Sequence, residues 1–234
     1  MQSIKQALDS QDSTKKIITK ESFSEAEFKD RKLKQTISRN IEDSMIPDRY
    51  KGFSLTDYEA LTDKQKEVLA VCKEFIDGRY ESGIILTGKS GTGKTMLCCL
   101  ILKQMIKRNP NENRGHESDW YLYTEAIKIV RDIKDTWGKE ATEQAAIDKY
   151  VKPKVLVIDE IGVQYGSETE TQFLTEIIND RYNQKKQTIL SGNETVIEML
   201  ETLGDRVIDR FRESGKVLVC DWESYRSKDA TIKA

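Results

Sequence analysis

Residues 88–95 carry the residue types and the spacing needed to bind phosphate groups. Their sequence is GKSGTGKT, in which Gly88, Gly93, Lys94 and Thr95 match the pattern G-x-x-x-x-G-K-[ST]. Glycines permit backbone conformations that turn successive N–H groups toward phosphate oxygens, and the helix that follows adds the positive end of its dipole. Lys94 is expected to reach the β- and γ-phosphates, and the Thr95 hydroxyl to ligate Mg²⁺. The predicted ATP-binding residues are Gly88, Lys89, Ser90, Gly91, Thr92, Gly93, Lys94 and Thr95.

Two acidic residues, Asp159 and Glu160, follow the apolar segment VLVI. In open α/β folds the carboxyl ends of the strands form the ligand-binding edge, so both carboxylates are expected there. Asp159 is predicted to hold Mg²⁺, directly or through water, as part of the nucleotide site. Glu160 is predicted to be the general base that polarises the attacking water. Such a pair is also typical of a solvated strand end. A Mg²⁺ site needs only the first carboxylate, so the second favours hydrolysis.

Three further polar residues follow later in the chain. Asn193 ends the segment QTILSGN and is a candidate to orient water or the γ-phosphate, although Gly192-Asn193 is equally typical of an ordinary turn. Arg206 and Arg210 lie four residues apart, which places them on one face of a helix. Spacing alone favours a surface helix with an Arg206–Asp209 pair. The alternative is an arginine finger that completes the ATP site of a neighbouring subunit.

Short apolar strands that alternate with helices must position these side chains. Strands are predicted at 83–87, 119–123, 154–158, 187–191 and 216–220. Helices are predicted at 62–77, 94–108, 124–136, 141–149, 169–184 and 194–212, the last with a break at Gly204. Strands without polar alternation, separated by helices, are typical of a parallel sheet that is buried on both faces. The predicted fold is therefore α/β, a five-stranded parallel sheet covered by helices on both faces.

The first 45 residues contain neither glycine nor proline and differ from the rest of the chain. Ser24 and Glu27, flanked by Phe23 and Phe28, form a capping box with a hydrophobic staple, which predicts a helix starting at Ser24. An apolar stripe then follows one helical face. Its members are Phe28, Leu33, Ile37, Ile41 and Met45. The pattern leaves two interpretations open, a helix that packs on its own domain and one that docks on a partner protein.

Pro47 is expected to end this helix, and the predicted domains follow from that position. Residues 1–46 are interpreted as a helical N-terminal extension and residues 47–60 as an irregular connector. Residues 61–234 are interpreted as the nucleotide-binding domain.

Composition limits the class of protein. Charged residues make up 33% of the chain and the net charge is −2, so charge gives no general attraction to nucleic acid. No apolar run approaches the roughly 20 residues that cross a bilayer, and the N-terminus lacks the apolar core of a signal peptide. The cysteines, Cys72, Cys98, Cys99 and Cys220, lack the spacing of metal ligands and are predicted to be buried reduced thiols. A cytoplasmic protein without a membrane segment is expected.

Several of these segments together resemble the DnaC-type replicative helicase loaders. They are the run VLVIDEIGVQ, its spacing to SGN, the segment LGDRVIDRFR and the ending DWESYRS. Members of this family are AAA+ ATPases that deliver the ring-shaped replicative helicase onto single-stranded DNA. The resemblance covers about residues 47–227. It implies an ATP-dependent loader that binds the hexameric helicase. In such loaders the N-terminal extension grips the helicase, and residues 1–46 fit that role by their position and their amphipathic helix.

The resemblance also implies roles for individual residues. Lys94 and Thr95 match the Walker A motif, and Asp159 and Glu160 match Walker B. Asn193 matches the first sensor, Arg210 the arginine finger that acts in trans, and Arg226 the second sensor. This match reverses the preference drawn from spacing and makes Arg210 a better candidate than Arg206. Self-assembly through Arg210 is therefore expected.

In this family the segment after Walker B contacts single-stranded DNA, with help from nearby aromatic residues. Here Tyr165 and Trp137 are the candidates, because stacking of one base on an aromatic ring contributes about 1–3 kcal/mol. Glu168 and Glu170 in the same segment repel phosphate and oppose strong binding. Trp137 is equally compatible with core packing.

Other functions are compatible with parts of the pattern. A transposition helper ATPase, which recruits a transposase, is closely related, and the GVQ segment and the WESYRS ending favour the loader over it. A nucleotide-switch adaptor that does not hydrolyse ATP would share the phosphate loop. A small-molecule kinase is disfavoured because no arginine cluster typical of a lid lies between the two Walker motifs.

Overall fold

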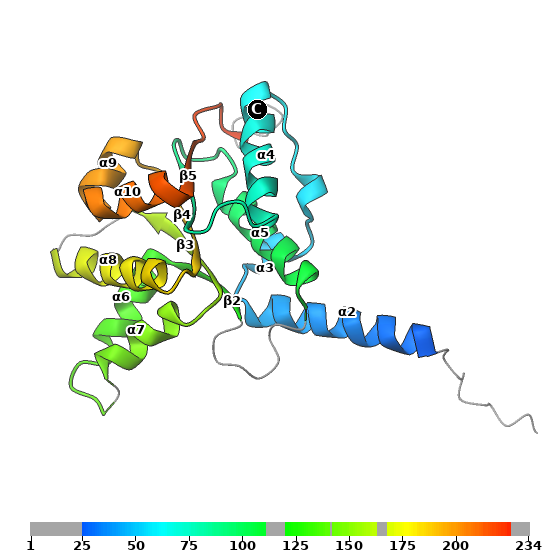
Figure 1. Ribbon diagram of the computed structural model, residues 1–234, viewed down its shortest axis with the longest axis horizontal. Coiled ribbons are helices and arrows are strands. Elements are labelled where there is room, and N and C mark those ends of the chain that lie inside the picture. Colours follow the sequence, from blue (N-terminus) through cyan, green and yellow to red (C-terminus); the bar gives the residue numbers. More distant parts are fainter. Residues whose placement is uncertain (1–24, 111–119, 141, 163–167, 226–234) are drawn as a thin grey trace, which may run out of the picture. The chain divides into compact units, whose positions relative to one another are not determined.

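The computed structural model describes residues 25–110, 120–140, 142–162 and 168–225 (Figure 1). The chain divides into two compact units, residues 1–35 and residues 36–234. The domain boundaries expected from the sequence, at 46 and 60, stay a prediction.

Helix α2 spans Glu25–Asp43, as the capping box predicts, while Ser24 itself lies outside the described residues. In the first unit Phe28 is 60% exposed and Leu33 is 41% exposed. In the second unit the end of the helix is packed, because Asn40 is buried and its side-chain amide donates to the carbonyl of Pro110 at 2.8 Å. The end of the helix therefore packs on its own domain, and docking of its first part on a partner stays a prediction.

The apolar stripe does not continue to Met45. The helix ends at Asp43, and Met45 has a φ of +62° and is 66% exposed. Ile46 is buried in the core instead. A turn that follows the helix changes the direction in which the side chains point, so the helical period no longer applies.

The segment predicted to be an irregular connector contains two short helices, α3 (Asp48–Lys51) and the 3₁₀ helix η1 (Leu55–Asp57). The buried Lys103 fastens it to helix α5 (Lys94–Arg108), because its ammonium group donates to the backbone carbonyls of Tyr50, Lys51 and Phe53. Short polar helical turns lack the apolar period that a sequence pattern can detect. The connector is therefore a packed part of the domain.

Five strands form one parallel sheet with the order β2-β3-β4-β1-β5. The strands are β1 (Gly83–Thr87), β2 (Tyr121–Glu125), β3 (Val155–Ile161), β4 (Gln187–Gly192) and β5 (Gly215–Val219). The predicted sheet is confirmed. Strand β3 is longer than predicted, because its pairing with β4 resumes at Ile161 and Gly192 after an irregularity that begins at Ile158. The two acidic residues thus lie inside the strand.

Helices cover both faces of the sheet, as Figure 1 shows. They are α4 (Asp63–Ile76), α5, α6 (Ala126–Lys134), α7 (Glu143–Val151), α8 (Glu168–Asn183), α9 (Val196–Leu203) and α10 (Asp205–Ser214). Ile84 and Leu86 of β1 pack in one apolar cluster, with α4 and α5. Ile85, between them, packs in the other cluster, with α6 to α10. Because alternate residues of a strand point to opposite faces, both faces are buried.

All four cysteines are buried and free, as predicted. Burial raises the pKa of Cys72 to about 12 and that of Cys220 to about 12. Within the described residues, no helix is both long and apolar enough to cross a membrane.

Candidate nucleotide-binding site

The phosphate-binding loop connects β1 to α5 and needs its glycines for two separate reasons. Gly88, Gly91 and Gly93 have φ values of +123°, +80° and +88°, a region that L side chains rarely adopt. The loop is also tightly packed. A Cβ atom on Gly88 would lie 2.3 Å from the carbonyl oxygen of Cys220, and one on Gly91 would lie 1.9 Å from the hydroxyl of Ser224. The loop leads directly into the start of α5, where free N–H groups can bind anions.

Lys94 is 6% exposed and lies at the centre of this loop. Its ammonium group donates to the carbonyls of Gly88 and Lys89, both at 2.7 Å, and to the side-chain oxygen of Asn193 at 3.0 Å. The structure therefore brings the predicted first sensor into contact with the Walker A lysine, although 99 positions separate them. This contact favours the functional interpretation of Asn193 over that of an ordinary turn.

Asp159 and Glu160 lie in neighbouring but different environments. Asp159 is 2% exposed, and its two oxygens accept hydrogen bonds from the Tyr123 hydroxyl at 2.8 Å and from the Glu160 amide at 3.0 Å. Glu160 is exposed and has a φ of +57°. Its carboxyl is nevertheless partly shielded from water, and this desolvation, followed by the charges of Asp159 and Glu125, raises its pKa. A carboxylate with a raised pKa is a better proton acceptor.

A cavity of about 560 Å³ joins these elements, within the usual size range of ligand pockets. Its lining includes Lys94, Thr95, Asp159, Glu160 and Asn193. The Thr95 hydroxyl and the Asp159 carboxylate supply oxygen donors of the kind that Mg²⁺ prefers, so these residues fit a nucleotide with its metal ion.

The connector also lines this cavity, which the sequence interpretation did not anticipate. Its contribution consists of Arg49, Tyr50, Phe53, Asp57, Tyr58 and Glu59. Aromatic rings offer an apolar surface for a nucleotide base. The one signal in the sequence is the density of aromatic residues between 50 and 58.

The C-terminal segment holds the phosphate-binding loop from the other side. The indole of Trp222 donates to the carbonyl of Thr92 at 3.0 Å, and the amide of Tyr225 donates to the carbonyl of Gly91 at 2.9 Å. The Tyr225 hydroxyl in turn donates to the carbonyl of Glu59 in the connector at 2.7 Å. Arg226, the predicted second sensor, lies outside the described residues.

Arg210 does not belong to the described lining of this cavity. Its guanidinium group donates to the side-chain oxygen of Asn179 on α8 and lies over the ring of Tyr182 at 4.4 Å. The spacing suggested an ion pair between Arg206 and Asp209, but Asp209 pairs with Arg212 at 3.2 Å instead. Arg206 is exposed.

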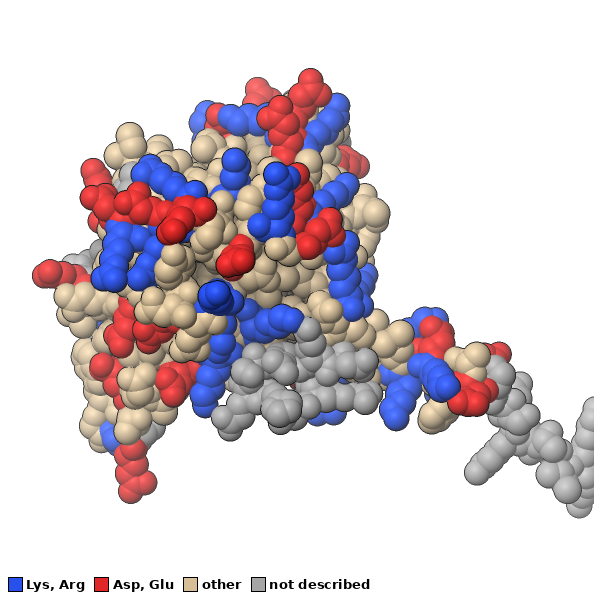
Figure 2. Space-filling view, in the orientation of Figure 1, with Lys and Arg blue, Asp and Glu red and all other residues tan. Residues whose placement is uncertain are grey.

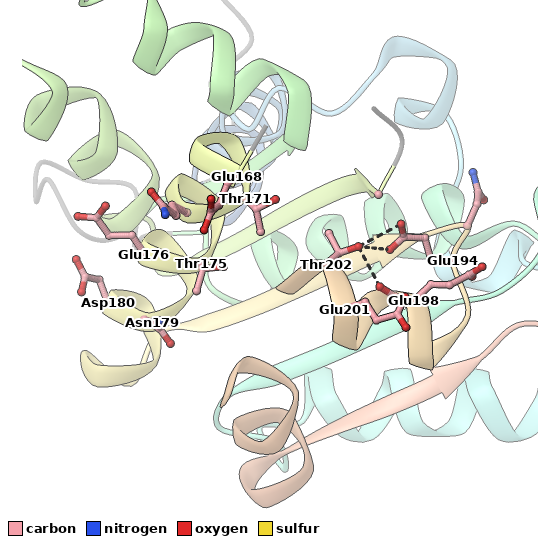
Figure 3. A pocket seen from close by; sticks show the side chains of 13 residues that line it. Glu168, Thr171, Thr175, Glu176, Asn179, Asp180, Glu194, Glu198, Glu201 and Thr202 are labelled. Atoms are coloured by element: carbon pink, nitrogen blue, oxygen red, sulfur yellow. Dashed lines mark hydrogen bonds between the residues drawn. The ribbon is translucent and has the colours of Figure 1, made fainter. Parts of the chain in front are cut away.

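A second cavity, of about 1180 Å³, is acidic and lies between α8 and α9 (Figure 3). Its carboxylates are Glu168, Glu176, Asp180, Glu194, Glu198 and Glu201. It adjoins the nucleotide cavity, because Asn193 lines both. The Thr202 hydroxyl contacts the carboxylate of Glu194 at 3.2 Å (Figure 3). Such a concentration of negative charge repels nucleic-acid phosphates from this side.

Of the two aromatic candidates for DNA contact, Trp137 lies within the described residues and Tyr165 does not. Trp137 is 56% exposed and its indole donates to Glu143 at 3.0 Å, so the core-packing interpretation is wrong. On the face shown in Figure 2, basic and acidic side chains are interspersed.

A strand, a glycine-rich loop and a helix define a P-loop nucleotide-binding domain when the same parallel sheet holds a strand with two carboxylates, and here one strand, β4, lies between β1 and β3. The chain belongs to the family of IstB-like ATP binding proteins, whose sequence profile matches residues 2–232. Comparison with individual proteins confirms the resemblance to DnaC-type loaders.

The replicative helicase loader DnaC of Escherichia coli (strain K12) is 29% identical over 209 residues, which are 87% of this chain and 80% of that protein. The replicative helicase loader DnaC of Buchnera aphidicola subsp. Acyrthosiphon pisum (strain APS) is 30% identical over 205 residues, 86% of this chain and 78% of that one. A crystal structure of the DnaC helicase loader superposes with a TM-score of 0.61 at 22% identity, over 74% of this chain and 99% of that chain. The fold is therefore shared.

Proposed function

We propose that this protein is an ATP-dependent loader that binds a hexameric replicative helicase and delivers it onto single-stranded DNA. The main support is that a chain with an assembled nucleotide site aligns, over most of its length, with proteins named replicative helicase loader. Those names favour the loader over a transposition helper ATPase.

The residues of the site are proposed to have separate roles in ATP hydrolysis. Lys94 would exchange its carbonyl partners for the β- and γ-phosphates, and Thr95 and Asp159 would hold Mg²⁺, whose charge would offset that of the phosphate oxygens. Glu160 accepts a proton from the attacking water. Asn193, which accepts a hydrogen bond from Lys94, is proposed to sense the γ-phosphate. Arg226 is proposed as the second sensor on the basis of the family pattern.

Arg210 is proposed to act on the nucleotide of a neighbouring copy. It lies outside the described lining of its own cavity and is held by Asn179 and Tyr182. An arginine in such a place can complete a second subunit's site when two copies assemble.

The N-terminal part of α2 is proposed as the contact with the helicase. Phe28 and Leu33 are exposed apolar side chains, and such residues are common at helix-mediated interfaces. Single-stranded DNA is proposed as a second and weaker ligand, with Trp137 exposed and Tyr165 as the other candidate.

The test is affinity capture from a lysate of the source cell with ATP present, followed by identification of the retained protein. The full chain is expected to retain the replicative helicase, and a chain lacking residues 1–35 is expected to lose it. This deletion spares Asn40, Ser44 and Ile46, which are buried, so the domain should stay folded. A deletion of residues 1–46 should instead lower stability.

Two full-length variants sharpen this experiment. Phe28→Ser with Leu33→Ser removes the exposed apolar surface and should weaken helicase capture at least tenfold. Lys29→Ser with Lys34→Ser, which affects only exposed ion pairs on the same helix, is the matched control and should capture normally. Undiminished capture by the first variant and by the 1–35 deletion would contradict the proposal, and capture of a transposase would support the alternative.

A further inference from the structure

Tyr123 on β2 contacts the predicted metal-binding carboxylate from outside the nucleotide cavity. Its hydroxyl donates to Asp159 at 2.8 Å, and the two side chains are 4% and 2% exposed. In the register of the parallel pair, Glu125 lies beside Asp159, so Tyr123 reaches diagonally along the strands. Tyr123 is not among the described residues that line the cavity, so it touches the carboxylate and not the nucleotide space.

The second oxygen of Asp159 is also held, by the amide of Glu160 at 3.0 Å. Asp159 therefore has one donor from its own strand and one from the neighbouring strand. A buried carboxylate needs such donors, because burial without them is costly. Two donors from different elements also prevent the carboxylate from rotating, since rotation would break both hydrogen bonds.

We propose that Tyr123 is a positioning residue that fixes the carboxylate of Asp159 in the orientation that binds Mg²⁺. This inference rests on the proposed role of Asp159 in holding the metal ion. Residues that orient metal ligands through hydrogen bonds typically contribute about 10–100-fold to metal affinity. The phenol ring packs in the apolar cluster that lies against α4 and α5, and only its hydroxyl contacts the carboxylate.

The experiment compares Tyr123→Phe with the wild type and with Tyr121→Phe. Tyr121 is a buried tyrosine two residues earlier on the same strand, so its variant controls for the loss of a hydroxyl from this face of the sheet. The affinity for a fluorescent ATP analogue is measured once with Mg²⁺ and once with a chelator. The readout is the ratio of the first affinity to the second, which is called the Mg²⁺-dependent gain. Thermal melts verify that each variant is folded.

The expected result is that Tyr123→Phe binds the analogue normally in the chelator and loses at least about tenfold of the Mg²⁺-dependent gain. Tyr121→Phe is expected to keep that gain. An unchanged gain in Tyr123→Phe, or an equal loss in both variants, would overturn the inference. A wild type that shows no Mg²⁺-dependent gain would count against the proposed site itself.

A second measurement tests whether Tyr123 acts through Asp159. Asp159→Asn alone should abolish most of the Mg²⁺-dependent gain, and adding Tyr123→Phe to it should cause no further loss. Independent losses from the two substitutions would show that the tyrosine acts elsewhere.

Discussion

Glu160 combines a strained backbone with an exposed carboxylate at the nucleotide cavity. Its φ of +57° is unusual for a residue with a side chain and costs on the order of 1–2 kcal/mol. Such strain persists where the surrounding structure holds it, and here pairing between β3 and β4 is irregular on one side of Glu160 and resumes at Ile161. The irregularity turns the second carboxylate toward the cavity, while Asp159 stays buried.

Replacement of Glu160 by Gln should preserve ATP binding and lower turnover by about 10²–10⁴-fold, because the amide keeps the shape and cannot accept a proton. Phosphate release and binding of a fluorescent ATP analogue measure the two effects. Glu198→Gln, in the acidic cavity, is the control and should hydrolyse ATP normally. Normal turnover in Glu160→Gln would exclude the general-base role, and a wild type without turnover would indicate a nucleotide-switch adaptor.

At the scale of secondary-structure elements, a single buried arginine joins the ends of two helices and two strands. Arg181 near the end of α8 is fully buried, and its acceptors among the described residues are all neutral groups. Its acceptors are the carbonyls of Tyr150, Val151, Pro153, Lys154 and Gln187 and the hydroxyl of Thr188. These atoms lie at the end of α7, just before β3 and at the start of β4. Strand β3 carries Asp159 and Glu160, and Asn193 directly follows β4.

Arg181→Met should lower the free energy of unfolding by about 2–5 kcal/mol, because it leaves several buried carbonyls without donors. Denaturant titration followed by circular dichroism measures this change. Arg212→Met removes an exposed arginine that pairs with Asp209, and its effect should stay within about 0.5 kcal/mol. Equal stability of the two variants would show that the carbonyls find other donors.

At the scale of the whole molecule, the nucleotide cavity and Arg210 are separate features of one chain. The cavity carries the Walker residues, and Arg210 lies on α10 with partners on α8. If Arg210 acts in trans, as proposed, a site divided in this way would be completed by a neighbouring copy.

Arg210→Ala should keep ATP binding and lose about 10³–10⁵-fold in turnover. A mixture of Arg210→Ala with Glu160→Gln should recover part of the activity, because the first variant supplies an intact site and the second supplies the arginine. Arg206→Ala is the matched control on the same helix and should be active. The absence of recovery in a mixture that demonstrably co-assembles would contradict action in trans.

The alternation of apolar strands and helices, with the glycine at 204, was sufficient to predict the parallel sheet, the bounds of β1 and the break at Gly204. These features depend on residues close together in the chain, where glycine and apolar spacing restrict the backbone directly. Predictions failed where the local period ended, as at Met45, or where short polar turns replaced it, as in the connector.

The eight residues GKSGTGKT by themselves determined the phosphate-binding loop, and the acidic pair after VLVI determined the second part of the site. Only the tertiary structure decided that Lys94 contacts Asn193, that the Tyr123 hydroxyl donates to Asp159 and that the Tyr225 amide donates to the carbonyl of Gly91. The physical reason is that a loop's conformation follows from its own residues. Contacts between distant residues depend on strand order and register, which are set by the packing of the whole sheet.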